Sequence, residues 1–206
     1  MKNTNIINFL KRGFDLVFSI LLLPLVIVLV AIPGILICVD SRGTVILRLD
    51  MIGKGGKLFK CVRFRTMFEN ADEILHLYLN NNEEAREKWH ICNDPDPRIT
   101  RVGRFLRKTS LYELPQIFNV LSGDMSFVGP RSYIAEFKDE VLGFSDLIFL
   151  MRPGITGPWR LSGRNKTTLE ERVKLDTSYV LNCSLWLDIV ILFKTIKVVL
   201  NEERSY

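Results

Sequence analysis

The sequence predicts an α+β protein that is mostly helical, with an N-terminal re-entrant membrane helix and a small cytosolic domain. Three features predict it: an apolar run at residues 16–39, two strand-like segments joined by glycines, and amphipathic helical stretches nearer the C-terminus. The 206 residues suffice for one domain with a core but not for two of ordinary size. We therefore expect residues 1–40 to anchor the chain, and residues 41–206 to form one cytosolic catalytic domain with a short β-hairpin and amphipathic interfacial helices.

The apolar run at residues 16–39 is long enough to cross a hydrocarbon core of roughly 30 Å as a simple spanning helix. It is too long for a cleaved signal peptide, and no small-x-small cleavage site follows it. Two features favour a hairpin-like re-entrant helix instead. Pro24 and Pro33 lie inside the run, where a proline removes a backbone hydrogen bond and kinks the axis. Basic residues, which prefer the cytoplasmic side, flank both ends. We expect a bend near Pro24, and an Arg12–Asp15 pair at the interface.

Composition narrows the classes of partner. The net charge of +5 favours anionic partners, which include nucleic acid, anionic lipid and phosphate-bearing substrates. The four cysteines form no C-x-x-C pair, which is typical of reduced thiols in a cytosolic setting. With only His76 and His90 in the chain, a histidine-based zinc site has almost no ligands available, and we do not expect zinc chemistry.

The remaining segments predict short elements. Residues 44–49 and 57–64 are expected to be strands of a hairpin, because the glycines at 53–56 lack the spacing of a phosphate-binding loop. Residues 69–89 predict a charged helix that ends before the prolines at 95 and 97. Residues 185–200 carry an apolar face at helical spacing, which fits either a core helix or, in a tethered protein, an interfacial one.

Residues 98–108 are dense in arginine and lysine. Such a run can be a solvated helix face, or it can face a polyanion while Phe105 and Leu106 pack inward. No nucleic-acid-binding motif accompanies the run, so we expect no nucleic-acid partner.

Two segments carry a resemblance to a known family. Residues 108–131 read KTSLYELPQIFNVLSGDMSFVGPR, and residues 152–157 read RPGITG, followed by LSGRN at 161–165. Together they closely resemble the bacterial sugar transferases, also called monotopic phosphoglycosyl transferases. The resemblance extends over nearly the whole chain and includes KR-x-x-D at 11–15, FRTM at 64–67, DPRITR at 96–101 and the stretch 186–197.

The resemblance implies a re-entrant anchor in the bacterial inner (cytoplasmic) membrane, with the catalytic domain on the cytoplasmic face. It implies transfer of a sugar phosphate from a nucleoside diphosphate sugar, most often a UDP-sugar, to polyprenol (undecaprenyl) phosphate. The step requires Mg²⁺ and forms a covalent phosphosugar on the aspartate of an Asp-Glu pair. Such a step initiates a surface glycan, for example an exopolysaccharide or lipopolysaccharide. The implied partners are these two substrates, membrane lipid, and a homodimer or a partner transferase.

This chain departs from the family pattern at the proposed nucleophile. Where the family reads Ser-Leu-Asp-Glu-Leu-Pro-Gln, Tyr112 replaces the aspartate and Glu113 remains. A phenol with an ordinary pKa of about 10 needs neighbouring cations to attack as an anion. Glu113 is the expected catalytic carboxylate and magnesium ligand, although Ser110-x-x-Glu113 also fits a capping box. A second departure is Leu49-Asp50-Met51, where the family usually carries Gln-x-Arg, and Ser132 replaces a proline.

Guanidinium groups suit phosphate oxygens, so arginines in the matching segments are candidates for binding the substrate phosphates. Ordinary salt bridges or backbone contacts are the alternative role for each of them. The glycines and prolines at 129–130 and 153–154 are expected to be turns that orient arginines. The candidates are Arg63, Arg65, Arg107, Arg131 and Arg152. Two functions follow: an active transferase, or a catalytically silent homologue that binds ligand or serves as a scaffold.

Overall fold

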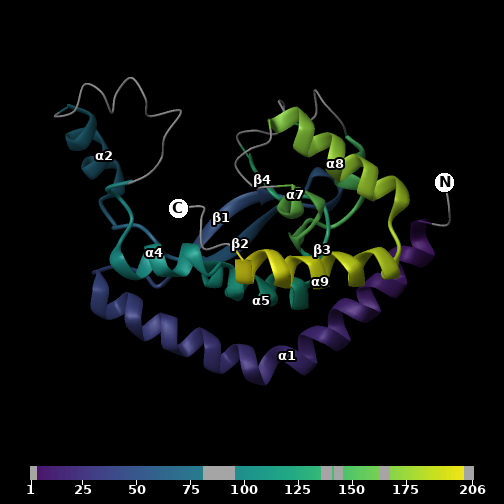
Figure 1. Ribbon diagram of the computed structural model, residues 1–206, viewed down its shortest axis with the longest axis horizontal. Helices are drawn as coiled ribbons and strands as arrows, with labels where there is room; N and C mark the ends of the chain where they lie inside the picture. The colour runs from purple at the N-terminus through teal and green to yellow at the C-terminus, as the bar shows by residue number, and fades with distance from the viewer. Residues whose placement is uncertain (1–3, 81–95, 136–140, 142–145, 163–167, 202–206) are drawn as a thin grey trace.

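The computed structural model describes residues 4–80, 96–135, 141, 146–162 and 168–201. Its longest element is the helix α1 (Thr4–Asp40), which has Pro24 and Pro33 inside it. Figure 1 shows α1 as a bent helix whose two ends lie closer to the other elements than its middle does. Prolines are an ordinary cause of such bends, because each removes one hydrogen bond and crowds the preceding turn.

The glycine-rich segment forms the hairpin that the sequence predicts. Strand β1 (Ile46–Ile52) pairs antiparallel with β2 (Leu58–Phe64), with Ile46 opposite Phe64. The connection is the short helix η1 (Lys54–Gly56), where Gly55 has a φ of 70° that favours glycine. Strand β1 starts two residues later and ends three residues later than expected. A short third strand, β4 (Tyr133–Ile134), pairs with β1, so the sheet order is β2-β1-β4.

A second, parallel pair joins β3 (Ser126–Val128) and β5 (Gly154–Thr156). A Cβ atom on Gly154 would lie 2.1 Å from the backbone nitrogen of Gly129, so the two chains approach as closely as glycine allows. The expectation of simple turns at both places is therefore wrong in part: Gly154 belongs to a strand, and the glycines serve close backbone packing.

Short helices complete the fold. They are α2 (Ala71–Asn80), α4 (Arg101–Lys108), η2 (Leu111–Gln116), α5 (Ile117–Ser122), η4 (Leu147–Leu150), α7 (Pro158–Leu161), α8 (Leu169–Asn182) and α9 (Leu185–Asn201). The expected helix 69–89 is confirmed over α2, and its second half lies outside the described residues. Thr100 caps α4 by accepting the N–H of Gly103, and Thr168 forms a capping box with Glu171 at the start of α8.

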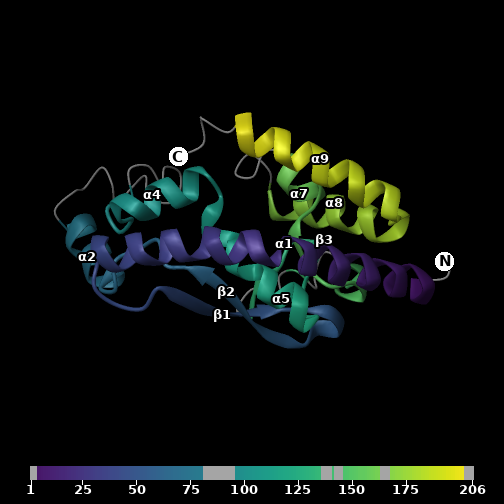
Figure 2. The ribbon, with the colours of Figure 1, turned by 90° about the horizontal axis from the view of Figure 1, so that it is seen from below.

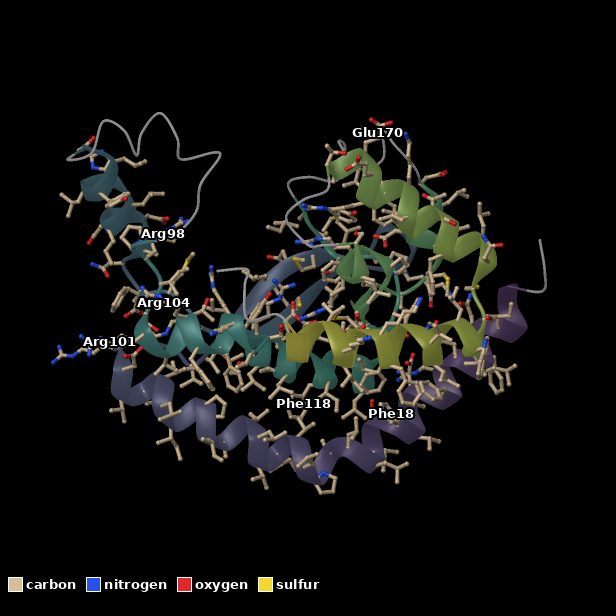
Figure 3. The ribbon with its side chains drawn as sticks, viewed as in Figure 1. Phe18, Arg98, Arg101, Arg104, Phe118 and Glu170 are labelled. Atoms are coloured by element: carbon tan, nitrogen blue, oxygen red, sulfur yellow. The ribbon has the colours of Figure 1, made fainter. Side chains whose placement is uncertain are left out.

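Helix α1 both joins the core and exposes a long apolar surface. Val26 and Ile37 are buried in two core clusters. Yet only 17% of its most apolar stretch is buried, unlike a core helix of a soluble protein. Residues Ile7–Asp40 are long and apolar enough to cross a membrane. Figure 2 shows α1 between the hairpin and α5 on one side and α4 and α9 on the other. On its outer side the sticks are almost entirely carbon (Figure 3).

The N-terminal end of α1 is held by buried polar contacts. Lys11 donates to the carboxylate of Asp188 on α9 at 2.5 Å and to the hydroxyl of Tyr179 on α8 at 3.1 Å. Asp15 accepts the N–H of Phe127 and the hydroxyl of Ser126, both at 3.1 Å. These bonds tie α1 to β3, α8 and α9, all of which lie more than 100 residues further along the chain.

The expected Arg12–Asp15 pair is wrong. Arg12 instead binds the carbonyl oxygens of Val120 and Leu121 at the end of α5, the second at 2.8 Å. Carbonyls at a helix end lack intrahelical donors and so accept from the guanidinium of Arg12, whereas the buried carboxylate of Asp15 is engaged by Ser126 and Phe127.

The C-terminal end of α1 is also held by contacts with the rest of the fold. Asp40 accepts the N–H of Val102 in the first turn of α4 at 3.0 Å. Arg65 is buried and donates to the carbonyl oxygens of Ser41, at 2.8 Å, and Arg42. Both ends of the bent helix are therefore fixed to one globular unit.

Candidate functional site

The segment with Tyr112 and Glu113 forms η2 rather than a capped α-helix. Ser110 precedes it with a φ of 59°, the left-handed region, and its side chain makes no capping bond. The capping box Ser110-x-x-Glu113 is therefore wrong. The sharp turn at Ser110 separates η2 from α4 and directs Glu113 inward, where the residue is only 7% exposed.

Glu113 forms a buried ion pair with Arg160 of α7. The Nη1 of Arg160 donates to Oε2 of Glu113 at 2.5 Å, and also to the carbonyl oxygen of Ile155 at 3.1 Å. The two side chains are 9% and 3% exposed. A buried charge survives only when paired and hydrogen-bonded, so each of the two requires the other.

Strand β2 places a second guanidinium close to this pair. Arg63 and Cys61 lie two residues apart and so share one face of the strand. Burial alone would lower the pKa of Arg63. The thiol of Cys61, the carboxylate of Glu113 and the phenol of Tyr112 all favour its charged form, and together they raise the pKa above its ordinary value. Arg63 therefore stays charged beside Glu113 and Tyr112.

A third guanidinium comes from the segment after β3. Arg131 lies over the ring of Trp159, with Cζ 4.7 Å from the ring centroid. Its backbone N–H donates to Oδ2 of Asp176 on α8 at 2.8 Å. Burial, followed by the charge of Arg172, lowers the pKa of Arg131. Like charges gathered in a buried place favour an anionic ligand that would offset them.

Asp176 is fully buried beneath Arg131. Burial raises the pKa of its carboxyl to about 7, although the N–H and the charge of Arg131 oppose the shift. Its Oδ1 makes no hydrogen bond within the described part of the chain. Asp176 therefore titrates near neutral pH and supports the Arg131 backbone in either state.

Several N–H donors around Glu113 are buried without an acceptor. Among the residues that the structure describes, Nε of Arg63, Nε2 of Gln116 and Nε1 of Trp159 have no hydrogen-bond partner. Gln116 follows Glu113 by three residues in η2, and Trp159 precedes Arg160. Buried donors are rarely left unpaired in folded proteins. A cluster of them beside three guanidinium groups is typical of a site for a phosphate or another multivalent anion.

Tyr112 lies at the edge of this cluster. It is half-buried and packs against the apolar group of Ile37, Phe64 and Leu106. Its hydroxyl is close enough to Arg63 and Arg131 for its charge state to affect the pKa of both. The tyrosine ring thus packs against apolar side chains, while its oxygen lies near two cations.

The other candidate arginines lie elsewhere. Arg65 holds the end of α1, and Nε of Arg107 donates to the hydroxyl of Thr66 at 2.8 Å. Arg152 donates from Nε to the carbonyl oxygen of Gly123 at 2.6 Å. The structure therefore brings Arg63, Arg131, Tyr112 and Glu113 together, and it does not bring Arg152 or Arg65 to them.

The site offers little for a magnesium cage made by the protein. Within the described ranges, no group of three or more His, Cys, Asp or Glu side chains is placed to hold a metal ion. The carboxylate of Glu113 is already engaged by Arg160. Magnesium is often held by one or two carboxylates together with substrate phosphates and water, and only that mode fits these residues.

Comparison with known proteins decides the family. The family model described as bacterial sugar transferase matches residues 6–202. The chain belongs to the bacterial sugar transferase family. It is 46% identical over 200 residues to the undecaprenyl-phosphate galactose phosphotransferase of Salmonella typhimurium, and 45% identical over 204 residues to the UDP-galactose-lipid carrier transferase of Erwinia amylovora. Both matches cover 96% of this chain.

The family match covers different shares of different relatives. The chain spans 42% of the length of the two galactose-related proteins. By contrast, it is 42% identical over 199 residues to the exopolysaccharide production protein ExoY of Rhizobium meliloti, and spans 88% of it. The region described here is thus the shared transferase region of both kinds of protein.

Residues outside the expected set complete the site. Arg160, Trp159, Gln116, Arg172 and Asp176 were not among the candidates from sequence. Trp159 and Arg160 lie between the matched segments 152–157 and 161–165, and that position is the local signal that points to them. Asp176 lies at a buried helical position in α8 and gives no such signal, because its partner Arg131 lies 45 residues away.

Proposed function

We propose that this chain transfers a sugar phosphate from a nucleoside diphosphate sugar to a polyprenol phosphate and so initiates a surface glycan. The observation that carries the proposal is the buried cluster of Arg63, Arg131 and Arg160 around Glu113, with unpaired N–H donors beside it. The reaction must bring two polyanions together, and preorganised guanidinium groups offset that repulsion. The names of the relatives point to undecaprenyl phosphate as the acceptor.

The bond changes are simple. The bond between the two donor phosphates breaks, a new phosphoanhydride with the acceptor phosphate forms, and a nucleoside monophosphate leaves. Tyr112 can act as the nucleophile, its phenolate stabilised by Arg63 and Arg131, so that the sugar phosphate is first carried on the chain. Alternatively Glu113 attacks, or it orients the acceptor phosphate for direct transfer. Magnesium dependence is part of the proposal, and we expect chelation to stop turnover.

The relatives suggest the order in which to test donors. Two with 45–46% identity are named for galactose, and others with 35–36% identity are named for glucose and N-acetylgalactosamine. The test is release of UMP from each UDP-sugar by the full chain in nanodiscs that contain undecaprenyl phosphate. We expect turnover with UDP-galactose first, and loss of it in Glu113→Gln. Absence of UMP release from all three donors would reject the proposal.

A second function, a silent homologue that binds ligand or supports an active partner, is favoured by one observation. Tyr112 replaces the nucleophile and packs against an apolar cluster, while the Glu113 carboxylate is neutralised by Arg160. Such a chain would bind the nucleotide sugar without releasing UMP. Equilibrium binding of UDP-sugar, measured beside the turnover assay, separates the two functions. Association with itself or with a partner transferase stays a prediction.

We propose that α1 is re-entrant in the inner membrane, with residues 41–206 on the cytoplasmic face. Support comes from both ends of α1, which are bound to one globular unit through Lys11 and Asp40. Exposed apolar side chains on neighbouring helices would lie at the same interface. They are Phe105 on α4, Phe118 on α5, and Trp186, Phe193 and Ile196 on α9. In Figure 3, Phe18 and Phe118 lie on the side of the molecule where α1 runs.

The test of this topology is cysteine labelling in spheroplasts with an impermeant maleimide. Asn3→Cys is compared with Lys174→Cys, which lies on the exposed side of α8, with the native Cys38, Cys92 and Cys183 changed to serine. We expect both sites to be labelled only after lysis. Labelling of position 3 alone in intact spheroplasts would indicate a spanning helix.

A further inference from the structure

A second cluster of positive charge surrounds the hairpin turn. A cavity of about 520 Å³ lies there, with Lys54, Lys57 and Arg152 in its lining. That volume falls within the ordinary range for sites that hold small ligands. The cavity also contains one carboxylate, Asp124, which already accepts a hydrogen bond from the hydroxyl of Ser122 at 2.7 Å. Positive charge therefore exceeds negative charge in the lining.

This cavity is separate from the Glu113 site. The hairpin strand β2 runs from the turn at one end to Arg63 near the other. Arg63 lies six residues beyond Lys57, which at about 3.3 Å per residue is roughly 20 Å along an extended strand. A phosphate in the cavity is thus too far from Glu113 to be the reacting group.

One cation of the cavity, Arg152, is held in place, whereas Lys54 and Lys57 are exposed at its rim. Arg152 is fixed through its bond to the carbonyl oxygen of Gly123. Burial lowers the pKa of Lys54, and the charge of Arg152 lowers it further. Two cations that disfavour each other in this way would both be stabilised by a shared anion.

The cavity lies next to the N-terminal part of α1 and to exposed apolar side chains. A Cβ atom on Gly123 would lie 3.3 Å from Nη2 of Arg12, so the cavity adjoins the N-terminal part of α1. Leu58 in the lining is 59% exposed, and Leu150, two residues before Arg152, is 46% exposed. A ligand with an anionic head and apolar chains matches this combination of cations, exposed leucines and an apolar helix.

We propose that this cavity binds the phosphate of an anionic membrane phospholipid headgroup through Lys54, Lys57 and Arg152. The proposal rests on the membrane position proposed for α1, but it does not depend on catalysis. Bound lipid would fix the hairpin turn at the membrane surface and thereby fix the height of Arg63, at the other end of the same strand, above it.

The test is lipid binding to the full chain in neutral detergent, followed by native mass spectrometry. Phosphatidylglycerol is titrated against phosphatidylcholine. We expect the wild type to prefer phosphatidylglycerol. Lys54→Gln and Lys57→Gln should each weaken that binding about fivefold, the value of one surface cation near an anionic lipid. Lys54→Arg should retain binding, and Lys174→Gln on α8 is the control with equal loss of charge. A thermal melt establishes that each variant is folded.

Three results would overturn the proposal. The first is equal affinity of the wild type and Lys54→Gln for phosphatidylglycerol. The second is displacement of the lipid by millimolar inorganic phosphate, which would assign the cavity to a free anion. The third is a selective loss of undecaprenyl phosphate binding in Lys54→Gln, which would assign it to the acceptor. Because the readout is binding rather than UMP release, failure here is distinct from failure of the transferase proposal.

Discussion

Replacing Arg160 with methionine removes the guanidinium that faces the buried Glu113 carboxylate and keeps a side chain of similar reach. Both partners are almost fully buried, and Nη1 of Arg160 lies 2.5 Å from Oε2 of Glu113. Removing one partner of such a pair costs about 3–5 kcal/mol, because the other charge is left without compensation. For a chain of this length each kcal/mol lowers Tm by about 2–4 °C, so we expect a decrease of roughly 6–20 °C.

The assay is thermal unfolding of the full chain in detergent, followed by tryptophan fluorescence. Trp159 is a suitable reporter because its ring centroid lies 5.7 Å from Cζ of Arg160. The double variant Glu113→Leu/Arg160→Met removes both charges and should unfold at a higher temperature than Arg160→Met alone. Apolar replacement of a complete buried pair is often neutral. Glu113→Gln should cost less than Arg160→Met, because the amide oxygen can still accept from Arg160.

Two results would refute this reasoning. If Arg160→Met lowers Tm by less than about 2 °C, the ion pair does not carry the stability assigned to it. If the effects of Glu113→Leu alone and Arg160→Met alone add in the double variant, the two side chains are not coupled. Lys174→Met is the matched surface control, since its pair with Glu170 is exposed and worth little.

The remaining predictions concern Asp176, Tyr112 and Gly154. The pKa of Asp176 is raised to about 7 in the folded chain, so the native state binds more protons than the unfolded state between about pH 4 and 7. Stability should therefore fall as pH rises through that range, and Tm of Asp176→Asn should lack this part of the fall. Tyr112→Phe should abolish UMP release if the phenol is the nucleophile and spare it if Glu113 acts, whereas Tyr112→Asp restores the family pair and should increase turnover. An unchanged rate in Tyr112→Asp would indicate that another departure limits the site. Gly154→Ala places a Cβ atom 2.1 Å from the Gly129 nitrogen, so it should lower Tm by about 6 °C or more, while Gly55→Ala, which meets no atom, should cost less.

Local features were predictable from the sequence. The hairpin follows from turn glycines between two apolar alternating segments, and its register is held by the turn. The apolar length of α1 and the helical spacing in α9 also follow from local pattern. In α9 the spacing could not say which apolar face is covered: Ile191 is buried, whereas Phe193 is 70% exposed.

Long-range pairs were not predictable, because their partners are far apart in the chain. Lys11 and Asp188 are separated by 177 residues, and each alone reads as an ordinary surface charge. Glu113 shows the same limit. Its spacing to Ser110 fits a capping box, but the left-handed turn at Ser110 and the pairing with Arg160 prevail over that local preference. Buried charge compensation is worth more than one cap.

The family resemblance identified candidate arginines, but it could not predict which of them bind substrate and which support the fold. Among the candidates from sequence, Arg65 binds the end of α1 and Arg152 lines the cavity at the hairpin turn, whereas Arg63 and Arg131 lie near Glu113. Arg65, Arg131 and Arg152 lie in matched segments and Arg63 directly precedes one, so the difference between these cations is one of position in the fold. The fold thus places arginines in three roles: structural support of α1, the proposed lipid contact and the proposed substrate site.

The charge balance at the site explains why Tyr112 matters for function. The guanidinium groups of Arg63, Arg131 and Arg160 lie near the carboxylate of Glu113, and the buried carboxyl of Asp176 lies beneath Arg131. An aspartate at position 112 would add another negative charge, whereas a protonated tyrosine leaves more positive charge for the donor diphosphate. Under the proposed function, tyrosine at this position would favour binding of the ground-state anion and weaken the attacking group. Binding that stabilises substrate and transition state equally does not raise kcat. A chain of this kind can hold its donor tightly and turn it over slowly, and activation of the Tyr112 oxygen by Arg63 and Arg131 decides between the two proposed functions.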